Sequence, residues 1–473
     1  MARVVMVGGG VVGLCGALML GRDGHDVTVL ERDPAPPPDP EDAWNGWERR
    51  GVNQFRLLHY FAPRFQGVME ANAPEVVRAL EAAGGLRSNP FREIPAEITG
   101  GFRDTDAVYD AVTARRPIAE AAIAGAVEAN ENVTIRRGVA VAGLLTGEAS
   151  SDGIPHVIGV RTEAGDELLA DIVIDAGGRR SKLPSLLADI GARAPIEEQE
   201  DCGFVYYGRH FRSGDGSVPA MFGPLLMPYE SLSVLTLPAD NGTWGVGLVV
   251  SAKDAALRGL KDVDTWTRTV KGYPLAAHWL DGEPIDDGIA VMAKIEDRHR
   301  TFVIDGEPVA TGVLALADSW ACTNPSVGRG ISIGVIHAAA LRDVLHDLPG
   351  GGALDPIGLA RSWHDATMET VEPWYRGTLS FDQGRLAQMH AEMEGSVFEP
   401  EPEYEVTMAL MAASGKDPEM LRTFLDIAGV IDAPANVFAR PGLFERVLEL
   451  GGGWRDEGLP GMSREELLAV VTA

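Results

Sequence analysis

Three glycines near the start of the chain are spaced to bring the backbone close to a phosphate group. Gly8, Gly10 and Gly13 follow the apolar residues 4–7 and precede an apolar helical pattern, so they form a G-x-G-x-x-G turn between a strand and a helix. The free N–H groups at the start of such a helix bind phosphate oxygens. A second apolar run ends at Glu31, where a carboxylate can accept hydrogen bonds from ribose hydroxyls. Together these residues predict a dinucleotide site.

The rest of the sequence supplies the elements that would hold this site. Residues 1–185 and 301–345 carry the alternating strand and helix patterns of one nucleotide-binding domain, in two parts. Residues 186–300 are rich in short strand patterns separated by turn signals, which indicates an inserted antiparallel sheet for the substrate. Residues 346–473 are mostly helical. We therefore expect an α/β protein with a Rossmann-like domain, an inserted β-rich domain and a helical C-terminal region.

Local signals give several helix boundaries. Apolar spacing predicts one helix over residues 63–83 and another over residues 107–129. Asp417 before Pro418 is typical of a helix start, and residues 463–466 match a capping box.

Composition argues against several classes of function. The formal net charge of -28 opposes binding to nucleic acid or to an anionic membrane surface. The apolar stretch 4–20 is explained by the strand, turn and helix, and no other run approaches the ~20 residues of a membrane span. Cys15, Cys202 and Cys322 are too scattered for a disulfide framework, and no C-x-x-C or His/Cys cluster suggests a metal. These features fit a protein of the reducing cytoplasm.

A second glycine-rich segment carries a family resemblance. Residues 316–330 read LADSWACTNPSVGRG. With the N-terminal turn, this segment resembles the G-D and N-P-x-x-G-x-G motifs of flavoprotein monooxygenases of the p-hydroxybenzoate hydroxylase type (group A), a class that includes squalene epoxidase. Segments 51–59, 115–120 and 139–142 are similar to further family segments, so the likeness covers roughly residues 1–345 in ordered pieces. It implies bound FAD and a FAD-binding domain of the glutathione reductase type.

The resemblance implies a set of FAD contacts. The first turn and strand would hold the phosphates and the adenosine, and the second glycine-rich segment would face the isoalloxazine. The helix that begins there would stabilise the negative charge of reduced flavin. The residues assigned to FAD are Gly8, Gly10, Val11, Val12, Gly13, Glu31, Arg32, Gln54, Arg116, Val141, Asp318, Pro325, Gly328, Gly330 and Ile331.

Two positions depart from the family pattern. Residues 174–181 read IDAGGRRS where hydroxylases carry an Asp-Gly motif implicated in FAD and NADPH binding. This departure argues against direct binding of the nicotinamide cofactor. Two electron sources stay open: NADPH or NADH, and a partner flavin reductase. The second departure is Ala317, which replaces the usual glycine before Asp318.

The resemblance implies an FAD-dependent monooxygenase. Such an enzyme inserts one atom of O2 into an apolar aromatic or alkene molecule, by hydroxylation or epoxidation through a C4a-hydroperoxyflavin. The cofactor performs the chemistry, while the protein positions the substrate and excludes water. No acid–base pair is required, and no catalytic residue is assigned. Tyr206, His210, Phe222 and Met227 of the inserted sheet are candidates for contact with the substrate, although for each of them packing in the core or at the surface is the favoured interpretation.

Other flavoprotein activities remain open. The small residues of segment 175–181 suit a flavin-dependent reductase of isoprenoid-like double bonds, and a non-redox FAD-dependent cyclase or a binding-only flavoprotein would share the fold. A halogenase is disfavoured because the first lysine of the chain is Lys182. In addition, the Trp44-Asn45-Gly46-Trp47 segment lacks the Ile-Pro of the halogenase motif.

Overall fold

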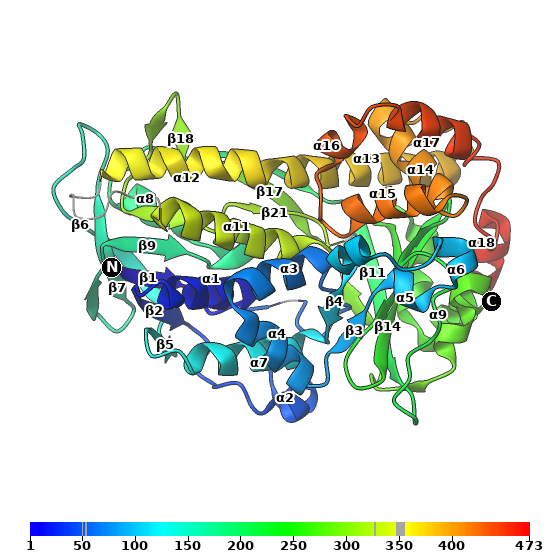
Figure 1. Ribbon diagram of the computed structural model, residues 1–473, viewed down its shortest axis with the longest axis horizontal. Coiled ribbons are helices and arrows are strands. Elements are labelled where there is room, and N and C mark those ends of the chain that lie inside the picture. The colour runs from blue at the N-terminus through cyan, green and yellow to red at the C-terminus, as the bar shows by residue number, and fades with distance from the viewer. Residues whose placement is uncertain (50, 53, 326–327, 347–354) are drawn as a thin grey trace.

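The centre of the protein is a parallel five-stranded sheet. The computed structural model describes residues 1–49, 51–52, 54–325, 328–346 and 355–473 (Figure 1). The strand order is β20-β9-β1-β2-β5, so the chain crosses the sheet several times. This arrangement, together with the antiparallel sheets and C-terminal helices, confirms the expected α/β fold class. The strands are β1 (Arg3–Val7), β2 (Asp26–Glu31), β5 (Val133–Arg137), β9 (Ile172–Asp175) and β20 (Val313–Ala315).

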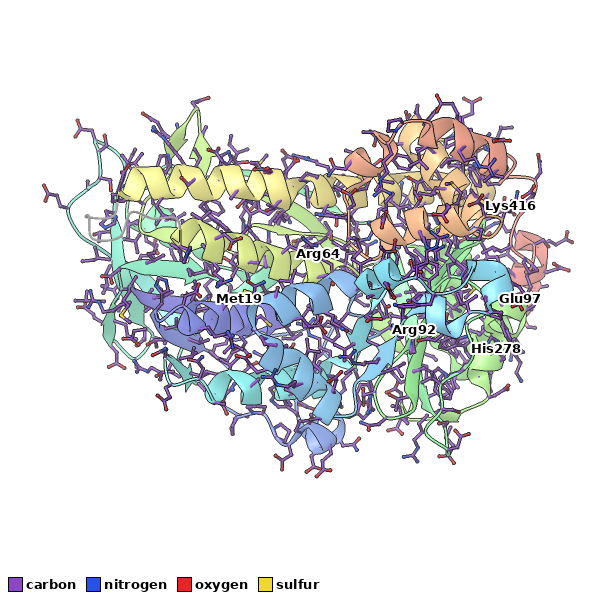
Figure 2. All side chains as sticks on the ribbon, in the orientation of Figure 1. Met19, Arg64, Arg92, Glu97, His278 and Lys416 are labelled. Atoms are coloured by element: carbon purple, nitrogen blue, oxygen red, sulfur yellow. The ribbon has the colours of Figure 1, made fainter. Side chains whose placement is uncertain are left out.

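This order brings the two glycine-rich segments to one edge of the sheet. Strand β9 lies between β1 and β20, and all three run parallel, with Val7 and Ala315 both paired to Asp175. The carboxyl ends of neighbouring parallel strands form the crevice where such sheets bind ligands. Helix α1 (Val11–Arg22) starts at this edge and packs against α7 (Arg116–Glu128) and α11 (Gly330–His346). Met19 of α1 is fully buried, whereas Glu97 and Lys416 point outward at the periphery (Figure 2).

A larger antiparallel sheet forms the second part of the protein. Its order is β12-β13-β14-β11-β15, with β16 also paired to β11. Helix α9 (Val263–Lys271) covers it with a core that includes the fully buried Trp266. The last helix, α18 (Arg464–Thr472), packs against α9, so the end of the chain joins this sheet (Figure 1). The strands are β11 (Phe204–Arg212), β12 (Leu226–Pro228), β13 (Leu232–Pro238), β14 (Thr243–Ser251), β15 (Glu283–Pro284) and β16 (Ala290–Met292).

Short sheets complete the β structure. They are formed by β3 (Leu86–Ser88) with β4 (Ala111–Thr113), by β6 (Val141–Thr146), β7 (Val157–Thr162) and β8 (Glu167–Leu169), by β10 (Ile196–Asp201), β17 (Glu296–Thr301) and β21 (Ala321–Cys322), and by β18 (Val303–Ile304) with β19 (Glu307–Pro308).

Two predicted helices differ in the structure. The helix expected over residues 63–83 is two helices, α3 (Pro63–Asn72) and α4 (Pro74–Ala82), because Pro74 has no N–H to continue the first one. The helix expected over residues 107–129 begins only at Arg116. Residues before it form the 3-10 helix η1 (Asp104–Tyr109) and strand β4, whose residues are all buried.

The C-terminal region is helical, as expected. Both predicted caps are confirmed: Asp417 accepts hydrogen bonds from the N–H groups of Glu419 and Met420, and Ser463 caps α18. Within the described ranges, no helix combines the length and hydrophobicity that crossing a bilayer requires. The helices before α18 are α12 (Pro356–Thr370), α13 (Glu372–Glu394), α14 (Pro402–Ser414), α15 (Pro418–Ala428), α16 (Pro434–Phe438) and α17 (Leu443–Gly451).

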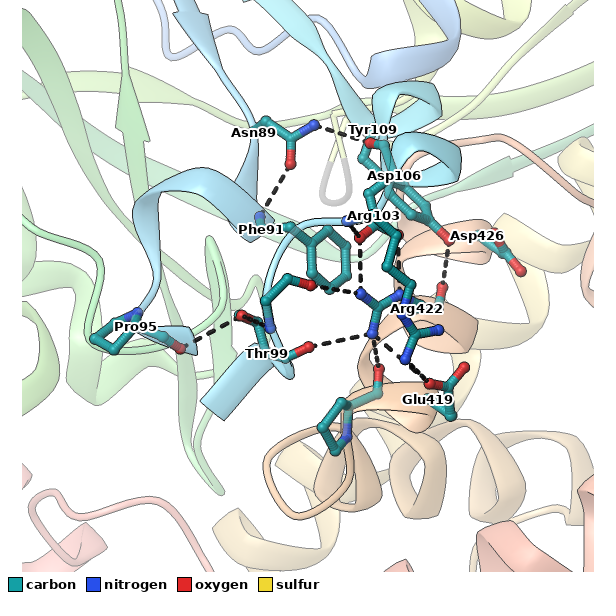
Figure 3. A network of polar contacts seen from close by, with 12 residues as sticks. Asn89, Phe91, Pro95, Thr99, Arg103, Asp106, Tyr109, Glu419, Arg422 and Asp426 are labelled. Carbon is teal, nitrogen blue, oxygen red and sulfur yellow. Dashed lines mark hydrogen bonds and ion pairs between the residues drawn. The ribbon is translucent and has the colours of Figure 1, made fainter. Parts of the chain in front are cut away.

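One buried arginine fastens the C-terminal helices to the N-terminal half. The Arg422 guanidinium of α15 donates to both carboxylate oxygens of Asp106, at 2.9 and 2.7 Å, and to the carbonyls of Thr99 and Gly101 (Figure 3). It also lies over the Phe91 ring, 4.3 Å from its centroid. Burial alone would raise the pKa of Asp106, but the contacts with Arg422 and with the Arg103 N–H together outweigh burial and hold the pKa below its usual value.

Replacing this arginine should cost far more stability than replacing an exposed one. Arg422→Met leaves the Asp106 carboxylate buried without its cation, so we expect the free energy of unfolding to fall by about 3–5 kcal/mol. The control is Arg446→Met, because the exposed Arg446 pairs with Asp417 and Glu449 on the surface and should change it by less than about 1 kcal/mol. Urea denaturation of both variants checks the difference, and equal losses would contradict the role of Arg422.

Candidate functional site

A large cavity lies where the two sheets and the C-terminal helices meet. Its volume is about 1590 Å³, more than the roughly 300–1,000 Å³ of a pocket for one small ligand. The wall includes both glycine-rich turns, strands β11 and β13, residues of segment 86–98, and helices α13 to α16. The cavity therefore has room for a dinucleotide and a second molecule.

The first glycine-rich turn is shaped by two close backbone contacts. Gly8 has a φ of +111°, and a Cβ atom there would lie 2.4 Å from the carbonyl oxygen of Ala176. A Cβ atom at Gly13 would lie 2.3 Å from the carbonyl oxygen of Gly8. At Gly10, by contrast, a Cβ atom would meet nothing within 4 Å. Gly10 is also the N-cap of α1 and supplies no side-chain cap, so this helix end faces open space suited to a phosphate.

The second turn lines the same cavity as the first. Asp318, Pro325, Gly328, Gly330 and Ile331 all line the cavity, and a Cβ atom at Gly330 would also meet nothing within 4 Å. Helix α11 begins at Gly330, so a second helix N-terminus faces the cavity. Ser326 and Val327, the middle residues of this motif, lie outside the described residues.

Backbone strain marks the position before Asp318. Ala317 has a φ of +54°, a left-handed conformation that suits glycine and costs other residues roughly 1–2 kcal/mol. The replacement of the family glycine by alanine therefore has a physical consequence here. The Ala317 N–H donates to Nδ1 of His337, which holds the strained turn in place. Burial lowers the pKa of His337 to about 3, so its imidazole is neutral and can accept this bond.

Glu31 lies in a buried network of charges. Its carboxylate accepts hydrogen bonds from the N–H groups of Gly9 and Asp33, both at 2.9 Å, and pairs with Arg49 at 2.5 Å. Arg49 also pairs with Asp33 and Glu120. Although burial works against its charge, the Glu120 and Glu31 carboxylates raise the pKa of Arg49. Sequence reasoning did not identify Arg49 as a site residue. Its only local feature is that it begins the run Arg-Arg-Gly at residues 49–51, and this run matches no binding motif.

Arg116 faces the cavity from the same network. Its guanidinium donates to Glu120 at 2.6 Å and to Nε2 of His59 at 3.0 Å. Burial, and then the charge of Arg116, lower the pKa of His59 to about 3, so His59 is a neutral acceptor that orients the arginine. Burial alone would raise the pKa of Glu120, but Arg116 and Arg49 outweigh burial and lower it. A ligand at Arg116 therefore meets a fixed positive charge.

The cavity wall contains most of the residues predicted to hold the cofactor. Val11, Val12 and Gln54 lie in it with Gly10, Gly13 and Arg116. Gly8 and Glu31 do not line the cavity. Gly8 packs against the backbone of Ala176, and the Glu31 carboxylate pairs with Arg49. Two predicted residues lie elsewhere: Arg32 is exposed with its guanidinium close to Gly51, and Val141 is on β6, away from the wall.

The structure separates the four candidates for substrate contact. Tyr206 and Phe222 line the cavity. His210 and Met227, in contrast, are not part of the wall. His210 is buried, and its ring nitrogen Nδ1 lies 2.9 Å from the Asp286 carboxylate. Met227 packs in the core of the antiparallel sheet and therefore does not line the cavity. For both residues, packing replaces the expected substrate contact.

A polar network missed in the sequence joins three parts of the chain at the second turn. The Tyr206 hydroxyl of β11 donates to the Asn324 side chain at 2.5 Å. The Asn324 amide in turn donates to Asp382 of α13 at 3.1 Å. The pairing of Tyr206 with Asn324 spans 118 positions, so no local pattern could have revealed it. Among the described residues, no group of three or more His, Cys, Asp and Glu side chains is placed to hold a metal ion.

Comparisons with known proteins agree with this architecture. No family model matches the chain. Protein Rv3254 of Mycobacterium tuberculosis is 26% identical over 455 residues, which cover 91% of this chain and 90% of that protein. PqsL of Pseudomonas aeruginosa, a probable FAD-dependent monooxygenase, has a similar crystal structure with a TM-score of 0.57 at 17% identity, covering 82% of this chain and 99% of PqsL.

Two further structures show what else this fold supports. OxyS, an anhydrotetracycline hydroxylase from Streptomyces rimosus, matches with a TM-score of 0.58 at 19% identity, over 91% of this chain and 76% of OxyS. PyrE3, a Diels-Alderase of pyrroindomycin biosynthesis, matches with a TM-score of 0.56 at 17% identity, over 91% of this chain and 80% of PyrE3. The chain thus has the fold of FAD-dependent monooxygenases, and that fold also occurs in a protein named for cycloaddition.

The buried neutral His337 should make stability depend on pH. In the unfolded chain this histidine takes up a proton below about pH 6.5, whereas in the folded protein its pKa is about 3. Stability is therefore fully present above pH 6.5 and is lost as the pH falls, by roughly 2 kcal/mol at pH 5. We expect His337→Asn to reduce the difference in unfolding free energy between pH 7 and pH 5 by this amount. An unchanged difference, measured by urea denaturation at both values, would contradict the assignment.

Proposed function

We propose that this protein is an FAD-dependent monooxygenase that inserts one oxygen atom from O2 into an apolar aromatic or alkene molecule. One observation carries the proposal: two glycine-lined helix starts face a single cavity, and that cavity continues into an apolar chamber beneath the C-terminal helices. The similarity in fold to PqsL and OxyS supports the same reaction class.

The residues present fit FAD. The open space at Gly10, beside the uncapped start of α1, suits the pyrophosphate, whereas Glu31 is buried outside the cavity wall and is already engaged by Arg49. Arg116 would add a fixed positive charge. Gly328 and Gly330 at the start of α11 would let the backbone approach the flat ring system. When bound, FAD supplies the redox chemistry and the activation of oxygen.

The protein's own contribution is to position the substrate and to exclude water. Leu235 and Leu237 of β13 form one wall of the chamber, and Leu410 and Phe424 of the C-terminal helices form another. Arg385 joins helix α13 to the start of β13, because its guanidinium donates to the carbonyls of residues 229 and 232 and to Ser233. An apolar chamber keeps water away from reactive intermediates and orients the molecule that they attack.

The electron donor is part of the same proposal. Segment 174–181 makes a closed turn, because Asp175 accepts hydrogen bonds from the Gly177 N–H and the Ser181 hydroxyl. Arg179 of this turn donates to the backbone carbonyls of Glu296 and Thr323. These groups are engaged within the protein, which supports electron delivery by a partner flavin reductase over direct binding of NADPH or NADH.

A non-redox reaction is the second candidate. The similarity in fold to PyrE3, which is named as a Diels-Alderase, favours it, because a cycloaddition needs no net oxidation or reduction. A flavin-dependent reductase of isoprenoid-like double bonds would use the same chamber. The three activities differ in their response to oxygen, which the oxygenase consumes and the others do not require.

Rapid mixing of the reduced protein with oxygen tests the proposal. Chemical reduction of the bound FAD makes the result independent of the electron donor. With an apolar aromatic or alkene ligand in the chamber, we expect a transient species that absorbs differently from both reduced and oxidised FAD. Direct return of oxidised FAD in a stopped-flow trace, with and without ligands, would favour the reductase or the cyclase.

A matched pair of glycine variants tests the cofactor site. Gly10→Ala places a methyl group in open space at a φ of -78°, so the flavin-free protein should keep its unfolding free energy within about 1 kcal/mol while FAD retention falls. Gly13→Ala collides with the backbone at Gly8 and should lose more than about 2 kcal/mol even without FAD. Absorbance of the purified protein measures FAD per chain. Full retention of FAD by Gly10→Ala would refute the proposed phosphate site.

A further inference from the structure

Four arginines of the described ranges line the cavity, and three of them have a carboxylate partner. Arg116 pairs with Glu120 at 2.6 Å, Arg179 lies 3.7 Å from Asp318, and Arg376 pairs with Glu372 at 2.7 Å and with Glu198 at 2.8 Å. The fourth is Arg329, in the N-P-x-x-G-R-G turn. No carboxylate among the described residues lies within ion-pairing distance of its guanidinium. Arg329 therefore presents a positive charge that the described part of the chain leaves uncompensated at short range.

The surroundings of Arg329 make this charge costly. Its Nε is buried and has no hydrogen-bond partner among the described residues. Removal from water lowers the pKa of Arg329 to about 10, and the more distant charge of Asp382 opposes this effect only in part. The group remains a cation at neutral pH. A buried cation without a close partner is unfavourable, so an anion that enters the cavity gains more here than at an exposed arginine.

The side chain of Arg329 is directed toward helix α13. The guanidinium lies over the ring of Trp374, 6.0 Å from its centroid. Trp374 is buried, and its neighbours Pro373 and Tyr375 line the cavity. Arg329 thus turns from the glycine-rich turn toward the helices that enclose the chamber. The N–H groups at the start of α11, one residue further on, add positive potential to the same space.

We propose that Arg329 binds an anionic oxygen of the substrate. Resting on the proposed function, this inference narrows the substrate class to apolar molecules that carry a carboxylate, phenolate or enolate. The apolar walls would hold the hydrocarbon part, and Arg329 would fix its orientation beside the start of α11 by charge-assisted hydrogen bonds.

The test compares an anionic probe with its neutral counterpart. The probes are 2-naphthoate and 2-naphthamide, which share a ring system and differ in charge, and binding is measured by calorimetry on the protein as purified. We expect the parent to prefer 2-naphthoate. In Arg329→Gln the affinity for 2-naphthoate should fall by about 10- to 100-fold, while the affinity for 2-naphthamide stays within about threefold. Arg329→Lys keeps the charge and should retain most of the preference.

Arg376→Gln is the matched control. Arg376 also lines the cavity, but its charge is balanced by two glutamates, so its removal should leave the preference for 2-naphthoate unchanged. Because the readout is a ratio of two affinities in one variant, a general loss of folding cannot imitate the result.

Several outcomes would overturn the inference. They are a parent that does not prefer 2-naphthoate, an equal loss of both probes in Arg329→Gln, and an equal loss of preference in Arg376→Gln. The midpoint potential of bound FAD is measured on the same samples. A shift in this potential without a change in the probe ratio would mean that Arg329 serves the cofactor, not the substrate. The oxygen reaction is measured separately, so failure of the proposed function is distinguished from failure of the Arg329 assignment.

Discussion

The structure depends on a backbone contact that leaves no room for side chains. Gly8 lies against the carbonyl of Ala176, and Gly13 lies against the carbonyl of Gly8. These contacts fix the start of α1 relative to β1 and β9. Since β20 pairs with the other side of β9, the same contacts set the distance between the first glycine-rich turn and the turn at Asp318. The shape of the ligand site therefore follows from atoms that carry no functional group.

The two ends of the cavity differ in charge: the end near Glu31 is rich in paired charges, and the end at the C-terminal helices is mostly apolar. At the end near Glu31, buried acids and arginines compensate one another, and the neutral His59 adds a further acceptor for Arg116. Such a network is rigid, and it gives a polar ligand groups with fixed orientation. Toward the C-terminal helices the walls are apolar, and no acid in the described part of the chain pairs with Arg329. This contrast suits one polar and one largely apolar occupant.

Turns and helix caps formed by residues close in sequence could be predicted, whereas contacts between residues far apart in sequence could not. The α/β fold class, the turn at Gly8–Gly13 and the cap at Asp417 could be predicted because each depends on neighbours within a few positions. The break before Pro74 was overlooked because apolar spacing continues across it. The packing of His210 and the pairing of Arg49 with Glu120 were invisible, since their partners lie 76 and 71 positions away. The assignment of individual residues to FAD stays a prediction.

The ion pair between Arg422 and Asp106 also has a consequence for the folding of the newly synthesised chain. Its two residues are 316 positions apart, and the helices that roof the chamber begin only after residue 355. A nascent chain can form the β1–α1 turn early, but Leu235 and Leu237 then remain uncovered until the helices after residue 355 have left the ribosome. Domains fold as they emerge, and uncovered apolar walls invite aggregation. Because the C-terminal helices that cover the chamber are synthesised late, we expect the growing chain to bind chaperones that shield apolar surface.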